Sequence, residues 1–235
     1  MNIGVVTVSG VHGVGKSAVC EFLKQTFATP PLPERPSNPF VDPYHSMMFF
    51  IVAYSKRDQA ARQLRSPLVI DRYSFHDIAV YVEVLHELNK VTDAQYETLR
   101  LVNTEVLCGS LDPEVAVLLE DDADSVVGRL IQRGGKPGHI FEYDREVIYH
   151  LNEAFTREFN NWEITRTWVG SRILSRPHLV KISVRGRSVS DVGCDLLSRL
   201  EELNVSSASV NKNVHESEGS LLAVPHENSG GGESL

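Results

Sequence analysis

The sequence predicts a doubly wound α/β sandwich, in which helices cover both faces of a parallel sheet. Several short segments are continuously apolar rather than alternating, which is typical of strands buried on both sides. These segments alternate with longer stretches of helical periodicity, the order expected of parallel βαβ units. The chain has 235 residues, of which 42% are hydrophobic, so one domain of this kind can bury a sizeable core.

About five strands are expected. Four of them are the apolar runs IGVVTV (3–8), PLVID (67–71), VAVLL (115–119) and LVKISV (179–184). A weaker run, second in chain order, lies near Leu32, where Pro30, Pro31 and Pro33 crowd it and cannot donate to a sheet ladder. Helical patterns cover about 16–27, 44–63, 76–90, 93–107, 122–133, 143–165 and 188–203.

Charge and cysteine usage exclude several classes of function. The formal net charge of −8 provides no overall basic field that could hold a nucleic-acid polymer. Cys20, Cys108 and Cys194 lack paired spacing, which indicates reduced thiols rather than a disulfide or zinc framework. The apolar start lacks the basic region of a signal peptide, and no apolar run approaches the ~20 residues that cross a bilayer. We therefore expect a soluble cytoplasmic protein without a membrane partner.

A change in composition near Asn204 divides the chain. Residues 204–235 are rich in Ser, Asn, Glu and Gly, end in SGGGESL and lack hydrophobic periodicity, which is typical of disorder. We expect a folded domain over 1–203 and a disordered tail over 204–235.

Residues 10–17, GVHGVGKS, fit the phosphate-binding loop (P-loop) pattern G-x-x-x-x-G-K-[S/T] between an expected strand and an expected helix. The glycines let backbone N–H groups surround phosphate oxygens, and the helix N-terminus adds positive potential. Lys16 is expected to reach the β- and γ-phosphates of ATP, and Ser17 to ligate Mg²⁺. His12 is interpreted as loop filler rather than as a catalytic base. The candidate phosphate-binding residues are Gly10, Val11, His12, Gly13, Val14, Gly15, Lys16 and Ser17.

Charged groups also follow the second and third expected strands, at the edge where ligands bind in open α/β sheets. Glu34, in ERPSNPF, can accept the proton of an attacking hydroxyl, as phosphoryl transfer requires. Asp71 and Arg72, in PLVIDRYSFHD, can support Mg²⁺ and stabilise charge on the transferring phosphoryl group. The alternatives are an exposed loop glutamate beside Arg35 and a surface ion pair at a strand end.

Together with RLIQRGGKPGHIFE, these two segments resemble the deoxynucleoside kinase family, especially its short bacterial-type deoxyadenosine and deoxyguanosine kinases. The resemblance extends over about residues 5–184. It implies Mg²⁺-dependent transfer of the γ-phosphoryl group of ATP to the 5′-hydroxyl of a deoxynucleoside, in nucleotide salvage. It also implies a helical lid, and a homodimer is expected on the same basis.

The resemblance also implies roles for single residues on the acceptor side. Glu34 matches the base that contacts the 5′-hydroxyl, and Asp71 and Arg72 match a pair near the metal and the 5′-oxygen. Asp77 matches the carboxylate that hydrogen-bonds the nucleobase edge. An acid that caps a helix N-terminus is the alternative interpretation of Asp77.

The expected lid contains further candidates. Arg129 and Arg133 are four residues apart on one helix face and precede GGKPG, an arrangement suited to clamping phosphates. By resemblance, Lys136 replaces the second lid arginine of the family, and Glu142 matches a lid glutamate that reaches the sugar. A solvated helix face is the alternative.

The chain departs from the family at the expected base site. The helix after the N-P segment carries a glutamine in the family, but here it reads HSMMFFIVAYSKRDQ, with Phe49 or Phe50 at that position. Arg57 matches a downstream arginine of the family, and Tyr44 is a candidate for contact with a sugar hydroxyl. Core packing is the alternative for the aromatic residues. Loss of the amide leaves an apolar wall, which predicts weak discrimination between bases.

Two other functions remain open. VIDRY (69–73) resembles the D-R-Y segment of thymidylate-type nucleoside monophosphate kinases, and Phe141 with Glu142 could match their lid, but no E-P-G-G segment follows the second expected strand. A non-catalytic ATP-binding regulator would need only Lys16 and Ser17. A GTPase is disfavoured, since no N-K-x-D segment follows the fourth expected strand.

Overall fold

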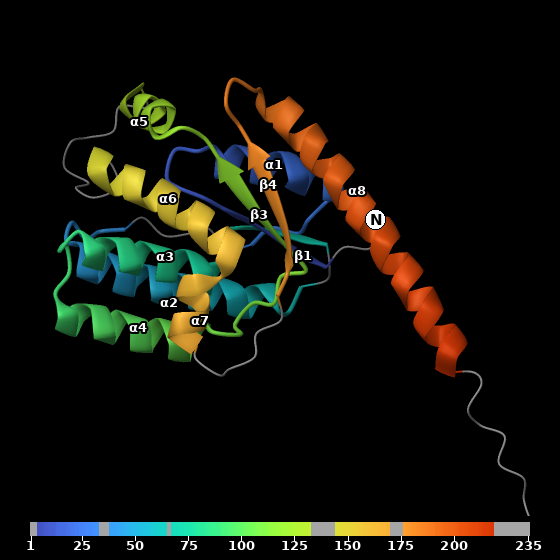
Figure 1. Ribbon diagram of the computed structural model, residues 1–235, viewed down its shortest axis with the longest axis horizontal. Coiled ribbons are helices and arrows are strands. Elements are labelled where there is room, and N and C mark those ends of the chain that lie inside the picture. The colour runs from blue at the N-terminus through green and yellow to red at the C-terminus, as the bar shows by residue number, and fades with distance from the viewer. Residues whose placement is uncertain (1–3, 33–37, 65–66, 133–143, 170–175, 219–235) are drawn as a thin grey trace, which may run out of the picture.

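The computed structural model describes residues 4–32, 38–64, 67–132, 144–169 and 176–218, with side chains as far as residue 203. Figure 1 shows an α/β body from which one long helix, α8 (Val189–Glu218), projects. Within these ranges, no helix combines the length and apolarity needed to span a membrane.

The sheet is parallel and has four strands in the described part of the chain, in the order β2-β1-β3-β4. The strands are β1 (Val5–Ser9), β2 (Leu68–Asp71), β3 (Val115–Glu120) and β4 (His178–Ser183). β1 is central, and Val8 pairs with Asp71 of β2 and with Val117 of β3. The carboxyl ends of these strands therefore lie side by side, at the edge where the sequence places its charged candidates.

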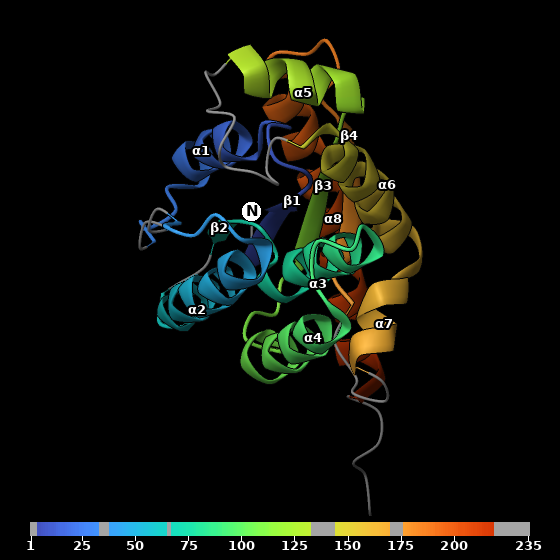
Figure 2. The same ribbon diagram turned by 90° about the vertical axis from the view of Figure 1, so that its left-hand side faces the viewer.

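Helices cover both faces of the sheet, as a doubly wound fold requires. The remaining helices are α1 (Lys16–Phe27), α2 (Pro43–Ala61), α3 (Ser74–Glu87), α4 (Asp93–Leu107), α5 (Ala123–Gln132), α6 (Arg145–Asn161) and α7 (Glu163–Val169). α1 and α8 pack together on one face, and α3 and α6 pack together on the other (Figure 2). α2 and α4 lie against α3 on its outer side.

The predicted second strand near Leu32 is not found as far as residue 32, where the described backbone is interrupted until residue 38. Leu32 lies in irregular backbone between α1 and α2, and the described sheet has four strands rather than five. Pro30 and Pro31 explain the difference, because neither residue has an N–H group to donate to a neighbouring strand. The predicted helical lid falls largely on residues 133–143, which are outside the described residues.

The predicted helix over 143–165 is two helices. Trp162 separates α6 from α7 and has a left-handed backbone, with φ 54°. The buried carboxylate of Glu158 accepts hydrogen bonds from the N–H groups of Ile164 (2.7 Å) and Thr165 (3.0 Å). These bonds satisfy N–H groups in the first turn of α7 that have no partner within the helix.

The backbone beyond residue 203 does not begin as an irregular tail. α8 continues to Glu218, so the change in composition near Asn204 is not a boundary of secondary structure.

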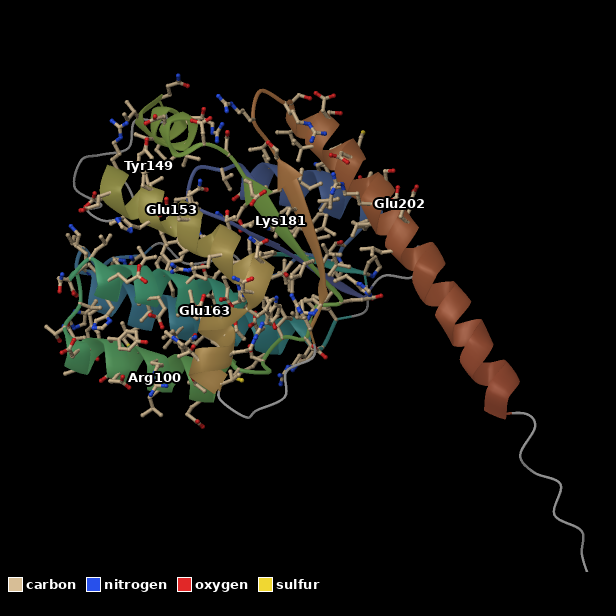
Figure 3. The ribbon with its side chains drawn as sticks, in the orientation of Figure 1. Arg100, Tyr149, Glu153, Glu163, Lys181 and Glu202 are labelled. Atoms are coloured by element: carbon tan, nitrogen blue, oxygen red, sulfur yellow. The ribbon has the colours of Figure 1, made fainter. Side chains whose placement is uncertain are left out.

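On the body itself, charged side chains of both signs lie over the outer elements, among them Arg100, Glu153, Glu163, Lys181 and Glu202 (Figure 3). Positive charge for binding a phosphate must therefore be gathered locally.

Candidate active site

The P-loop follows β1 directly and has the backbone that its glycines permit. Gly10, Gly13 and Gly15 have φ values of 131°, 77° and 110°, in a region that favours glycine. A Cβ atom on Gly10 would lie 2.7 Å from the carbonyl oxygen of Leu119, and one on Gly13 would lie 2.8 Å from Cγ of Leu130. The loop is therefore fitted closely against β3 and α5.

Lys16 is folded back over this loop. Its ammonium donates hydrogen bonds to the carbonyl oxygens of Gly10 (2.7 Å) and Val11 (2.6 Å), and the residue is buried. Burial, with a smaller contribution from the nearby Arg72 guanidinium, lowers the pKa of Lys16 to about 7. Lys16 can exchange the two carbonyl oxygens for anionic oxygens without leaving the loop, which would favour its charged form.

Ser17 and Asp71 form an oxygen-rich pair beside the loop. Ser17 Oγ donates to Asp71 Oδ2 at 2.9 Å, whereas the buried Asp71 Oδ1 has no hydrogen-bond partner among the described residues. Burial raises the pKa of Asp71, but the Lys16 and Arg72 cations outweigh that effect and lower it below its usual value. A charged carboxylate with one unsatisfied oxygen next to a hydroxyl suits Mg²⁺, which binds few protein oxygens and keeps the rest of its coordination for phosphates and water.

Arg72 has an unusual backbone and a buried guanidinium. Its φ is 80°, a left-handed conformation that costs a residue with a side chain about 1–2 kcal/mol. The guanidinium lies 3.1 Å from His12 Nδ1 and 3.4 Å from Asp77 Oδ2. Because arginine only donates, His12 Nδ1 is the acceptor, and the proton of the neutral imidazole is on Nε2. Arg72 thus connects the P-loop to α3.

Asp77 is inside the protein rather than at an exposed helix start. It lies in the first turn of α3, is 1% exposed, and accepts a 2.5 Å hydrogen bond from Ser9 Oγ through Oδ1. Burial raises the pKa of Asp77, although the Arg72 cation acts in the opposite direction. The carboxyl group is therefore held by Ser9 at the end of β1 and by Arg72 directly after β2. A residue that only caps a helix would not need these two contacts.

A small cavity lies between α2 and α3, next to the P-loop. Its free volume is about 10 Å³, roughly the room of one water molecule. The polar end is formed by His12, Arg72 and Asp77, and the remaining lining is Met47, Phe50, Tyr54, Ile78 and Tyr81. A nucleobase does not fit in this volume, and the cavity could admit one only if these side chains moved.

The candidates on α2 have different positions. Phe50 lines the cavity, whereas Phe49 packs between Phe40 and Phe50, with ring centroids 6.1 and 5.7 Å apart. Tyr44 is partly buried against the core and does not line the cavity. Arg57 also does not line it, because its guanidinium is directed at the turn after β2.

On the lid side, only Arg129 lies within the described residues. Its Nε donates to the Gly13 carbonyl oxygen (3.0 Å) and its Nη2 to Asp121 Oδ2 (2.6 Å). Arg129 therefore supports the P-loop from α5. The other acceptor-side and lid candidates, Glu34, Arg133, Lys136 and Glu142, lie outside the described residues.

Sequence reasoning missed Tyr54, Ile78 and Tyr81 as cavity residues. Each belongs to an apolar helical pattern, which equally describes core packing. A usable signal was their spacing from other candidates: Tyr54 is four residues after Phe50, and Tyr81 is four residues after Asp77. Residues four apart share a helix face.

Comparisons with known proteins find similarity to deoxynucleoside kinases and to a thymidylate kinase. No protein-family profile matches the chain. A curated relative, the deoxyadenosine/deoxycytidine kinase of Bacillus subtilis, is 24% identical over 174 residues, which cover 67% of this chain and 76% of the relative. A solved structure of deoxyadenosine kinase from M. mycoides with dCMP and dCDP is similar in fold, with a TM-score of 0.68, 16% identity, and coverage of 84% of this chain and 99% of that one. Thymidylate kinase from Candida albicans is also similar, with a TM-score of 0.59, 14% identity, and coverage of 86% and 93%.

Proposed function

We propose that this chain is a member of the deoxynucleoside kinase family and transfers the γ-phosphoryl group of ATP to the 5′-hydroxyl of a deoxynucleoside. The motifs, the curated relative and the fold support this assignment. The observation that carries the proposal is that the P-loop, as donor site, and the cavity between α2 and α3, as acceptor site, would meet at the adjacent ends of β1 and β2. His12 belongs to the loop and also lines the cavity. Phosphoryl transfer requires this proximity, because donor and acceptor must react in line.

On the donor side, the P-loop N–H groups and Lys16 bind the ATP phosphates. Ser17 and Asp71 hold Mg²⁺, which neutralises charge on the phosphates when it is bound. The lid residues Arg133 and Lys136 are proposed to close on the phosphates, and Arg129, now bonded to the Gly13 carbonyl oxygen, is proposed to join them.

On the acceptor side, the base enters between α2 and α3, and Asp77 hydrogen-bonds its edge. Glu34 is our candidate for the base that removes the 5′-hydroxyl proton. Arg72, buried beside the P-loop, stabilises the charge that develops as the phosphoryl group moves. Tyr44 and Glu142 are proposed to contact the sugar. We also propose that the protein works in the cytoplasm, as its cysteine spacing indicates, and that it pairs as a homodimer, as its family resemblance implies.

A nucleoside monophosphate kinase is the second candidate. Asp71, Arg72 and Tyr73 match the D-R-Y segment, and the fold is similar to that of the Candida albicans thymidylate kinase. In such an enzyme Arg72 would bind the acceptor phosphate. Asp77 opposes this role, because its carboxyl group lies 3.4 Å from the Arg72 guanidinium and would repel a phosphate there. The nucleoside is therefore the favoured acceptor.

The deciding experiment offers radiolabelled ATP and Mg²⁺ with eight separate acceptors, the four deoxynucleosides and their four monophosphates. Label in deoxynucleoside monophosphates supports the proposal, whereas label only in diphosphates supports the second candidate. Lys16→Ala serves as the inactive control for contaminating kinases. Failure of all eight acceptors, with ATP still bound, would favour a regulator.

A further inference from the structure

We propose that Arg57 and Asp58 are positioning residues, which hold the Asp71–Arg72 turn in its reacting geometry, and that Arg57 does not read the nucleobase. The inference rests on the proposed function, since the turn carries the proposed metal ligand and the proposed charge-stabilising arginine. Arg57 and Asp58 lie on α2, and the turn follows β2.

The guanidinium of Arg57 is bonded to the turn itself. Nη1 donates to the carbonyl oxygen of Asp71 (2.5 Å), and Nη2 donates to the carbonyl oxygen of Arg72 (3.1 Å) and to Ser74 Oγ (2.5 Å). The side chain is 12% exposed. Three of its acceptors thus lie within four consecutive residues, 71–74.

Asp58 fixes the orientation of this guanidinium. Its side chain is fully buried, and Oδ1 accepts hydrogen bonds from Arg57 Nε (3.2 Å) and Nη2 (3.0 Å). Oδ2 accepts a bond from Ser110 Oγ (2.8 Å), in the segment after α4. All three nitrogens of Arg57 are therefore engaged, and a planar guanidinium held at every nitrogen has little freedom to turn toward a ligand.

The two carbonyl groups that Arg57 binds control the backbone of Arg72. The Asp71 carbonyl belongs to the peptide plane before the Arg72 Cα atom, and the Arg72 carbonyl belongs to the plane after it. Because peptide groups are planar, holding both oxygens fixes φ and ψ of Arg72. This residue needs such support, since its φ of 80° is unfavourable for any residue with a side chain.

Release of the turn would move the groups that the reaction uses. With a relaxed backbone, the Arg72 guanidinium would leave its places beside His12 and Asp77, and Asp71 would turn away from Ser17. Arg57 itself stays behind the cavity wall, where its guanidinium lies 4.7 Å from the ring centroid of Tyr54. A base in the cavity would meet Tyr54 rather than Arg57.

The test compares Arg57→Lys with Arg62→Lys. Arg62 is a matched control, because it follows α2 and also donates to backbone carbonyl groups, but to those of Gly109 and Ser110 after α4 rather than to those of the Asp71–Arg72 turn. Lysine keeps the charge but loses the planar fork. For Arg57→Lys we expect kcat to fall by about 10²-fold by the same factor for every accepted deoxynucleoside, with each acceptor KM within about threefold. Arg62→Lys should retain wild-type kinetics.

Two results would overturn the proposal. One is a loss in Arg57→Lys that differs tenfold or more between bases and appears in the acceptor KM, which would mean that Arg57 reads the base. The other is an equal effect of Arg57→Lys and Arg62→Lys. If Arg57→Lys does not fold, Asp58→Asn replaces it: this variant keeps the acceptor Oδ1 but weakens the ion pair. A smaller, base-independent fall in kcat is then expected, and unchanged kcat contradicts the proposal.

A second measurement separates this inference from the proposed function. If the wild-type protein phosphorylates no deoxynucleoside, the proposed function fails, but the support of the turn can still be measured by amide hydrogen exchange. The Arg72 N–H donates to the Val8 carbonyl oxygen (2.9 Å). Its exchange should accelerate in Arg57→Lys, relative to core amides of α1, and stay unchanged in Arg62→Lys. Equal protection in both variants would refute the positioning role.

Discussion

The donor loop and the acceptor cavity differ in how the chain builds them. The donor loop is one continuous segment, residues 10–17, whose shape depends on glycines: a Cβ atom would crowd Leu119 at Gly10 and Leu130 at Gly13, and Gly15 has a φ of 110° that favours glycine. The acceptor cavity collects side chains from the loop, from α2 and from α3, and they close to about 10 Å³. The proposed donor site is therefore preformed, whereas the proposed acceptor site would have to open, so changes in the two sites should have different effects.

The largest effect is expected on the donor side, from Lys16→Ala. Phosphoryl transfer by this machinery depends on positioning and electrostatics, so turnover should fall by at least about 10³-fold. The fold should be retained, because the Lys16 ammonium bonds only carbonyl groups of its own loop. Turnover is measured with labelled ATP, and folding by circular dichroism.

Lys24→Ala is the control for Lys16→Ala. Lys24 lies in the last turn of α1, away from the loop, and its removal should leave turnover unchanged. Near-native turnover in Lys16→Ala would mean that the donor site is elsewhere.

A smaller effect is expected on the acceptor side, from Asp77→Ala. Loss of one charged hydrogen bond to the base should lower kcat/KM for the best deoxynucleoside by about 10²-fold, while ATP binding is retained. The apolar lining predicts measurable activity with at least two deoxynucleosides. The fall in kcat/KM and the number of accepted deoxynucleosides are both measured from initial rates with each of the four deoxynucleosides.

Asp93→Ala is the matched control for Asp77→Ala. Asp93 is also an acid in the first turn of a helix, α4, but its side chain is exposed. If Asp77 served only as a helix-terminal acid, both variants would change stability and neither would change selectivity. Strict use of one base, with Asp77→Ala unaffected, would show that specificity lies in other residues.

The contrast also explains what could be predicted from the sequence. The place of the glycine-rich loop between β1 and α1 and its left-handed glycines agree with the pattern of residues 10–17, because glycine spacing reveals backbone conformation. Periodicity predicted the order of the other strands and helices, except near Leu32, where Pro30 and Pro31 prevent pairing, and at Trp162, where one predicted helix is two. Contiguous patterns report local structure well.

Side-chain direction could not be predicted in the same way. Arg57 was placed at the base by its position in the chain, but its guanidinium binds the backbone of Asp71 and Arg72. Tyr54 and Tyr81 line the cavity although their patterns are those of core residues. Each of these outcomes depends on contacts between segments far apart in sequence, which periodicity does not contain.

A pH effect of intermediate size is expected for ATP binding. The pKa of Lys16 is lowered to about 7 without a ligand, and bound phosphates should raise it again. Above pH 7, binding must therefore take up a proton, and ATP affinity should fall by up to about tenfold per pH unit. Calorimetry at pH 8, in buffers of different ionisation enthalpy, measures this uptake.

Lys16→Arg is the control for proton uptake, because a guanidinium stays charged at pH 8. If this variant binds ATP, its binding should take up less proton than that of the wild-type protein. Wild-type binding without proton uptake would contradict the lowered pKa and would imply that Lys16 is already charged in the ligand-free loop.

The smallest effect is expected from removal of residues 204–235. The residues of α8 that belong to the core precede this point, since Val192, Leu196 and Leu200 are 2%, 0% and 0% exposed. A chain ending at Leu203 should therefore match the full chain in melting temperature and turnover. A chain ending at Asp195 is the control: it loses Leu196 and Leu200, and the loss of two buried leucines should lower the melting temperature by about 10 °C or more. If the chain ending at Leu203 melts more than a few degrees lower than the full chain, the distal part of α8 contributes to the body despite its polar composition.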